Sequence, residues 1–127
     1  MTDEEIQLGC PIRDVLQQVM DTWSVGILLL LRHGTLRFSE IYRQLPGNIS
    51  KRMLSKTLRS LEEHGLINRR VYPTKPPRVE YELNDLGRSF LPILQNLEQW
   101  AIQHQEQVLA AREAFQQKDD CQFWEAK

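Results

Sequence analysis

The sequence predicts a mainly α-helical domain that carries one small β-hairpin. Three observations favour this class: apolar residues recur at helical spacing in several segments, two short alternating segments flank a proline-rich loop, and a long apolar stripe follows them. A chain of 127 residues is long enough for one domain, and 41% hydrophobic and 26% charged residues are typical of a soluble globular protein.

Two helices are predicted at the start of the chain. Pro11 suits the first position of a helix, with Cys10 directly before it. This helix should end near residue 20 and has one apolar stripe, Ile12, Val15, Leu16 and Val19. Asp21 or Thr22 can cap a second helix over residues 23–32. Because that helix is apolar on nearly all sides, we expect it to be central.

A third and a fourth helix follow a short extended piece at residues 36–38. Ser39 is the predicted cap of the third helix, which should turn Ile41, Tyr42 and Leu45 inward. Residues 46–48, Pro-Gly-Asn, then break the chain sharply. Ser50 is the predicted cap of the fourth helix, which should run to His64 because Gly65 is a helix-stop signal.

Residues 66–72 and 78–83 alternate as strands do, and a stiff basic loop over residues 73–77 joins them. Asn84 is then placed to cap a long helix that reaches about residue 116. Two helices joined by a tight turn and followed by a hairpin form a winged helix-turn-helix. We therefore expect a winged domain with its dimerisation helix over residues 10–108, and a helix end and tail over residues 109–127.

Positive charge is concentrated in one segment. Residues 37–80 hold ten of the sixteen Lys and Arg but four of the seventeen acidic residues, a net charge of +6 in a chain whose overall charge is −1. A charged segment of this kind is often only a solvated face, but it is also the first sign of a nucleic-acid-binding protein.

The fourth helix separates its cations from its apolar side chains. Leu54, Leu58 and Leu61 share one face. At 100° per residue, Arg52, Lys56 and Arg59 lie about 140° to 200° from Leu54, with Ser55 beside them. Such a row fits the major groove of DNA, where Arg and Lys donate to guanine or phosphate.

The predicted hairpin adds a second basic element. Lys75 and Arg78 flank a tip stiffened by two prolines, and Arg69 and Arg70 lie on the strand before it. A rigid basic wing can hold a minor groove or the flanking backbone. The predicted DNA-contacting residues are Ser50, Lys51, Arg52, Ser55, Lys56, Arg59, Lys75 and Arg78.

Several motifs support this interpretation: Cys10-Pro11-Ile12, Trp23, Arg37-Phe38-Ser39-Glu40, Ile49-Ser50-Lys51-Arg52-Met53-Leu54, Gly65-Leu66-Ile67, Arg70-Val71-Tyr72-Pro73 and Pro76-Pro77-Arg78-Val79-Glu80-Tyr81. From Cys10 to about Trp100 the chain resembles HxlR-type transcriptional regulators. The resemblance implies a homodimeric winged-helix regulator, related to the MarR group, that binds inverted-repeat operators. It also implies that residues 50–59 form the recognition helix and residues 74–78 the wing.

The last predicted helix indicates a homodimer independently of that resemblance. Its apolar stripe is long: Leu86, Phe90, Leu94, Leu97, Ala101, Val108 and Leu109, widened by Ile93, Trp100 and Ile102. A small winged domain covers only part of such a surface, and a large exposed apolar patch marks an interface. Two recognition helices in a two-fold dimer would meet a pseudo-palindromic site.

Cys10 has two interpretations. Directly before a helix that starts at Pro11, its thiol would be activated by the helix dipole, and HxlR-type regulators with Cys-Pro at this place include sensors of oxidants or electrophiles. The resemblance thus makes Cys10 a candidate redox sensor, with Cys121 of the tail as a candidate disulfide partner. The alternative is that Cys10 is a small, inert packing residue.

Other classes of function are disfavoured by the sequence. The three histidines lack ligand spacing, and no glycine-rich phosphate loop or paired catalytic carboxylates occur, so we expect no metal, no cofactor and no enzyme activity. No apolar run reaches the roughly 20 residues that span a bilayer, which favours a cytoplasmic protein. The main alternative to DNA binding is a winged-helix protein-interaction module.

Overall fold

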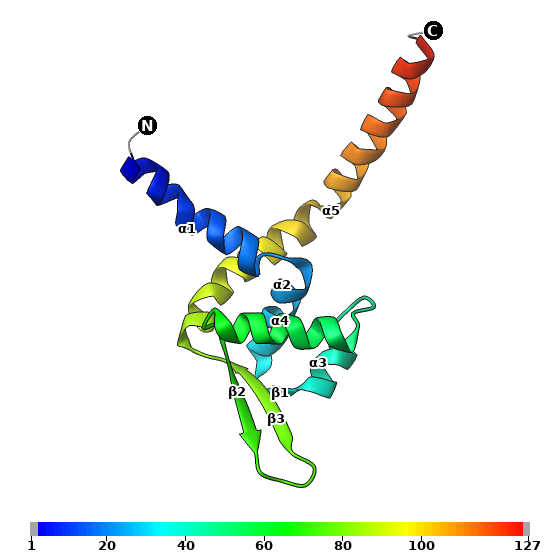
Figure 1. The fold of residues 1–127 in the computed structure, drawn as a ribbon. Helices are drawn as coiled ribbons and strands as arrows, with labels where there is room; N and C mark the ends of the chain where they lie inside the picture. The colour runs from blue at the N-terminus through cyan, green and yellow to red at the C-terminus, as the bar shows by residue number, and fades with distance from the viewer. Residues whose placement is uncertain (1–2, 126–127) are drawn as a thin grey trace. The chain divides into compact units, whose positions relative to one another are not determined.

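The computed structural model describes the backbone of residues 3–125 and the side chains of residues 11–118. The elements in chain order are α1 (Asp3–Val19), α2 (Thr22–Leu30), the short 3₁₀ helix η1 (Leu31–His33), β1 (Leu36–Arg37), α3 (Phe38–Gln44), α4 (Lys51–Glu63), β2 (Ile67–Tyr72), β3 (Arg78–Leu83) and α5 (Asp85–Glu125), as Figure 1 shows. The chain divides into two units, residues 1–94 and residues 95–127, and α5 contributes to both. The predicted winged helix-turn-helix is confirmed in the first unit.

The sheet of the first unit is antiparallel and has the strand order β1-β3-β2. The hairpin pairs Arg69 with Tyr81 and Tyr72 with Arg78 across the two long strands. The extended piece expected at residues 36–38 is a third strand, because Leu36 of β1 pairs with Tyr81 of β3. Since these partners are far apart in sequence, the pattern of residues alone did not predict this pairing.

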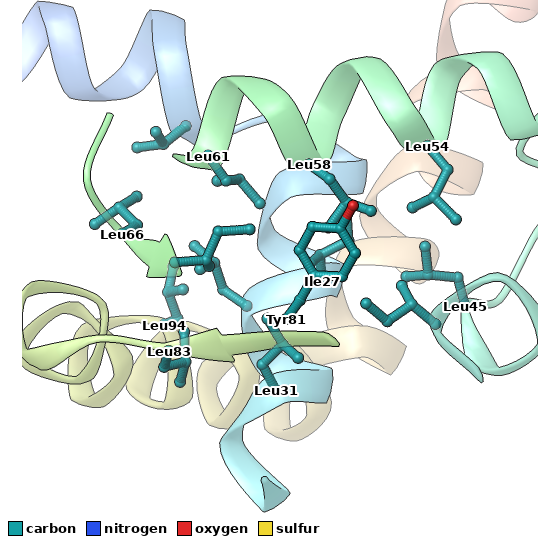
Figure 2. Packing of buried hydrophobic residues seen from close by; sticks show 14 of the residues in the cluster. Ile27, Leu31, Leu45, Leu54, Leu58, Leu61, Leu66, Tyr81, Leu83 and Leu94 are labelled. Atoms are coloured by element: carbon teal, nitrogen blue, oxygen red, sulfur yellow. The ribbon is translucent and has the colours of Figure 1, made fainter. Parts of the chain in front are cut away.

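One hydrophobic core lies between the helices and the inner face of the sheet. Figure 2 shows side chains from α2, α4 and the strands meeting there. Leu54, Leu58 and Leu61 are all fully buried, which confirms the predicted inner face of α4. The central position predicted for the second helix is also confirmed, because Ile27 and Leu28 are among the most buried residues.

Two predicted helix caps are confirmed. The carboxylate of Asp21 accepts hydrogen bonds from the backbone N–H of Ser24 at 2.8 Å and from its hydroxyl at 2.7 Å. The Ser50 hydroxyl accepts from the backbone N–H of Met53 at 3.0 Å, which fixes the start of α4. The second helix is shorter than predicted, since it ends at Leu30 and tightens into η1 before Gly34.

The third helix differs from the prediction at its start. It begins at Phe38 with Arg37 as the capping position, and the carboxylate of Glu40 accepts a hydrogen bond from the Arg37 backbone N–H at 3.0 Å. Ser39 therefore lies inside the helix. Tyr42 is 38% exposed rather than turned inward, and the ammonium group of Lys51 lies 5.7 Å from the centre of its ring.

The outer ends of α1 and α5 correct two further predictions. Helix α1 starts at Asp3 and contains Pro11, so Cys10 lies within a helix and not before one. The acidic run at residues 3–5 favours a helix start there, because negative charge stabilises the N-terminal end of a helix. The dipole argument for a reactive Cys10 is thus wrong. Helix α5 runs to Glu125 and includes Cys121, since no glycine or proline ends it near residue 116. The side chains of both cysteines lie outside the described residues.

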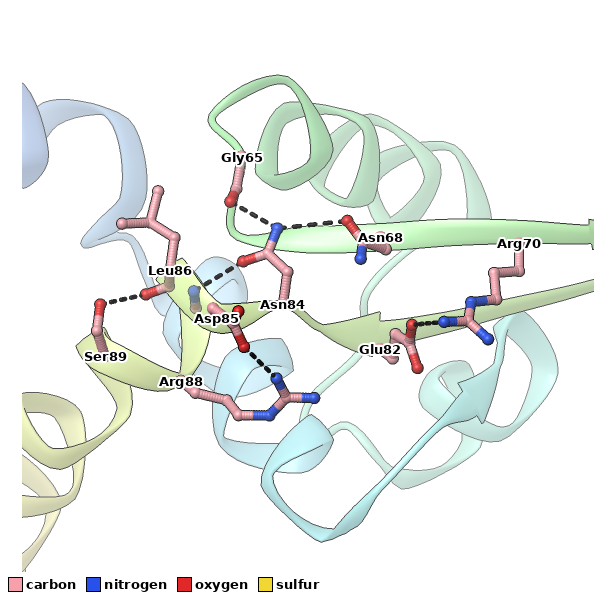
Figure 3. Close-up of polar contacts among 10 residues, drawn as sticks. Gly65, Asn68, Arg70, Glu82, Asn84, Asp85, Leu86, Arg88 and Ser89 are labelled. Atoms are coloured by element: carbon pink, nitrogen blue, oxygen red, sulfur yellow. Dashed lines mark hydrogen bonds and ion pairs between the residues drawn. The ribbon is translucent and has the colours of Figure 1, made fainter.

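Asn84 joins the base of the hairpin to α5, as Figure 3 shows. Its side-chain oxygen accepts from the backbone N–H of Gly87 at 2.9 Å, which confirms the predicted cap. Its side-chain nitrogen donates to the carbonyl oxygen of Gly65 at 2.7 Å. The residue therefore satisfies one backbone group just before β2 and one in the first turn of α5, which fixes the start of α5 against the end of α4.

Candidate nucleic-acid interface

The outer face of α4 is a row of exposed polar side chains. Arg52, Ser55, Lys56 and Arg59 are all exposed, opposite the buried leucines. The guanidinium of Arg59 makes an i,i+4 ion pair with Glu63 at 3.4 Å. Both partners of this pair are largely exposed, and surface pairs of this kind contribute little to stability. The arginine side chain therefore stays available to a competing anion.

The N-terminal end of α4 is occupied by two residues with distinct roles. Ser50 uses its hydroxyl oxygen as the helix cap, so this group already accepts a hydrogen bond from the backbone. Lys51 lies over the ring of Tyr42 and thereby links α4 to α3 across the helix-turn-helix. A cation held over an aromatic face keeps its charge while its motion is restricted.

The wing, defined here as β2, β3 and residues 73–77 between them, has a mixed outer face. The guanidinium of Arg78 pairs with Glu80 at 2.6 Å and lies 5.8 Å from the ring centre of Tyr72. Arg70 pairs with Glu82 at 2.6 Å, visible in Figure 3. Lys75 is exposed at the tip and makes no ion pair within the described residues. Within the described residues, the wing therefore carries Arg78 in an ion pair and Lys75 without one.

A hollow of about 380 Å³ separates α4 from the wing. Ser55, Arg59 and Glu62 line it from α4, and Arg69 and Tyr81 line it from the two strands. We call this space the α4–wing hollow. Tyr81 did not appear in the predicted site because its place in an alternating strand indicates only a core residue. Arg69 was visible as a basic residue near the wing, but its direction depends on the register of the hairpin.

A second group of cations surrounds α3. Arg37, Arg43 and Arg78 share a hollow with Glu40 and Glu80 at the outer edge of the sheet. Within the described residues, Arg37 and Arg43 make no ion pair. The predicted site omitted both arginines, although their position in the basic segment was a usable signal.

The described residues hold neither a metal-binding cluster nor a membrane-spanning helix. In that part of the chain, no cluster of three or more His, Cys, Asp or Glu is arranged to hold a metal ion. No helix in the same part is long and apolar enough to cross a membrane.

The fold and this surface define the class of the protein, a winged helix-turn-helix. Residues 18–109 match the HxlR-like helix-turn-helix family, and the chain belongs to that family. Its members are transcriptional regulators rather than enzymes.

Three comparisons illustrate the relationship. The HTH-type transcriptional regulator YtfH of Escherichia coli is 42% identical over 104 residues, which are 82% of each chain. The structure of the regulator ytfH from Salmonella typhimurium has a TM-score of 0.74 and 44% identity, and the match covers 81% of this chain and 91% of that one. The redox regulator HypR in its reduced form also has a TM-score of 0.74, with 32% identity over 79% of this chain and 98% of that one.

Proposed function

We propose that this protein is a homodimeric transcriptional regulator that binds an inverted-repeat DNA operator. The observation that carries the proposal is the exposed row Arg52, Ser55, Lys56 and Arg59 on α4, in the same unit as the basic wing. In a helix-turn-helix the second helix enters the major groove and the first crosses the backbone, which assigns these roles to α4 and α3. The wing then reaches the adjacent minor groove. Repression is the expected outcome, because a protein bound at a promoter obstructs polymerase.

The homodimer is supported by apolar side chains that one chain leaves exposed. The described residues of the second unit form a single helix, and a single helix has no core of its own. Trp100 is 55% exposed there and Phe115 is 70% exposed. The first unit adds Ile12 and Leu16 of α1, which are also exposed. Apolar surface of this kind is stabilised by a partner, and a second copy offers the same surface under two-fold symmetry.

A redox response is a second proposal, and the likeness to the redox regulator HypR favours it. Cys10 is the candidate sensor and Cys121 the candidate partner thiol. The test is operator binding before and after treatment with diamide. Wild-type affinity should change, and Cys10→Ser should not respond. An equal response in the two proteins would show that Cys10 is not the sensor. A response retained in Cys121→Ser would show that a disulfide between Cys10 and Cys121 is not required.

DNA binding is tested by selecting genomic fragments that the full-length protein retains, followed by fluorescence anisotropy on the recovered operator. Arg52→Ala should weaken operator binding by about 1–3 kcal/mol and leave random duplex almost unaffected, as expected for a base contact. Lys75→Ala should weaken every duplex alike. If no duplex is retained, the alternative is a winged-helix protein-interaction module. If the two variants behave identically, the assignment of base contact and backbone contact is wrong.

A further inference from the structure

Tyr81 is an unusual member of the core because its hydroxyl has no partner. The residue is 8% exposed, and Figure 2 shows its ring among the leucines with the oxygen on the side of α4. Within the described residues, the hydroxyl makes no hydrogen bond. In the same part of the chain, no side-chain oxygen or nitrogen is both sealed from solvent and unpartnered. The hydroxyl must therefore reach the surface, and the surface that Tyr81 lines is the α4–wing hollow.

The other groups of this hollow are suited to an anion. Arg59 and Arg69 contribute two positive charges and Glu62 one negative charge, a net charge of +1. Ser55 and Tyr81 add hydroxyl donors on opposite sides. Arg69 lies across the hairpin from Tyr81 in the register of the sheet, so both strands present a donor at the same level. A phosphodiester group in the hollow would compete with Glu63 for Arg59, and that ion pair is largely exposed and contributes little to stability.

The place of the hollow identifies the source of that phosphate, given the proposed function on which this step rests. If α4 lies in a major groove and the wing reaches the adjacent minor groove, the sugar–phosphate strand between the two grooves must pass between α4 and the wing. The α4–wing hollow is the space at that position. We propose that it binds one backbone phosphate of the DNA, with the hydroxyl of Tyr81, whose ring is held in the core, as a fixed donor.

This contact should contribute to affinity and not to sequence preference, because phosphates are present in every duplex. The Tyr81 ring is already held by the core, so little side-chain freedom is lost when the phosphate arrives. Hydrogen bonds to charged groups are among the stronger ones, and the loss of one donor should reduce affinity about tenfold, or about a hundredfold when both subunits of the proposed dimer lose it.

The test uses Tyr81→Phe in the full-length protein, which removes the hydroxyl and retains the ring in the core. Fluorescence anisotropy should show about a hundredfold weaker binding to the operator and to random duplex alike, because each dimer loses two donors. The midpoint of urea unfolding should stay close to that of the wild type, which separates this effect from loss of fold. The matched control is Ser89→Ala, which removes the hydroxyl of an exposed residue on α5 outside the hollow.

The contacted phosphate can then be located with duplexes that carry one neutral methylphosphonate each. At one position on the strand between the two grooves, the loss of affinity should be about tenfold smaller for Tyr81→Phe than for the wild type, because the variant has no Tyr81 hydrogen bond to lose there. Both proteins should still lose the attraction of Arg59 and Arg69 to that charge. Ser89→Ala should lose as much affinity at that position as the wild type. Inorganic phosphate should compete no better than chloride at equal ionic strength.

Several outcomes overturn the inference without touching the proposed function. One is wild-type affinity retained by Tyr81→Phe. Another is a Tyr81→Phe penalty that persists whichever phosphate is neutralised. Stronger competition by inorganic phosphate than by chloride would assign the hollow to a free anion. Failure of the wild type to bind any duplex would instead refute DNA binding itself.

Discussion

The salt dependence of DNA binding can be worked out from the cations on α4 and the wing. Within the described residues, Lys51, Lys56 and Lys75 make no ion pair, whereas Arg59 and Arg78 are paired with glutamates. If Arg52 contacts bases, these three lysines give six phosphate contacts in a dimer. At about 0.9 counterions released per contact, the slope of log affinity against log salt is about −5 or steeper. Affinity should then fall about a thousandfold between 50 and 200 mM salt.

Removing one lysine should change this slope by a predictable amount. Lys56→Ala deletes two contacts per dimer, so the slope should become shallower by about 2. Lys118→Ala is the matched control, since Lys118 is an exposed lysine of the second unit. The assay is fluorescence anisotropy on the recovered operator at several salt concentrations. A wild-type slope shallower than about −3, or equal slopes for Lys56→Ala and the wild type, would refute the assignment of these lysines to phosphates.

Three other substitutions test the packing. Leu58→Ala should lower the free energy of unfolding in urea by about 2–5 kcal/mol, because Leu58 is 1% exposed. Gly87→Ala should also destabilise, although alanine normally favours a helix, because a Cβ there would lie 2.1 Å from the carbonyl oxygen of Leu66. Trp100→Glu should convert the proposed dimer to monomers in analytical ultracentrifugation, since a charge would replace an exposed apolar contact. An unchanged free energy of unfolding would contradict the prediction for Leu58→Ala or Gly87→Ala. An unchanged sedimentation coefficient would contradict the prediction for Trp100→Glu.

The parts of the fold that follow from local rules were predictable from the sequence. The buried stripe of α4 depends on helical spacing alone, and its start at Ser50 depends on a side chain three residues from its partner. Where two local rules compete, the prediction failed. Pro11 favours a helix start, but the acidic residues 3–5 favour an earlier one, and α1 begins with the latter. Cys10 therefore lies within α1 and not before its first residue.

The candidate site was predictable only as a set of residue types. Spacing on α4 identifies the outward cations, but the ion pairs of Arg59 and Arg78 depend on rotamers and strand register. Tyr81 shows most clearly that the role of a residue depends on its position in the fold as well as on its type. Its alternation in β3 indicates a core residue, and the side chain is indeed buried. Only the position of α4 relative to the sheet shows that the hydroxyl meets a hollow rather than another leucine.

The position of α4 relative to the wing also makes the hairpin base important for DNA binding. Asn84 bonds to the carbonyl of Gly65, just after α4, and to the backbone N–H of Gly87 in α5. A change in α5 that displaced Asn84 would release the segment between α4 and β2, and both α4 and β2 line the α4–wing hollow. Because a phosphate must meet donors from both elements at once, a small shift of one against the other would weaken all of these contacts together.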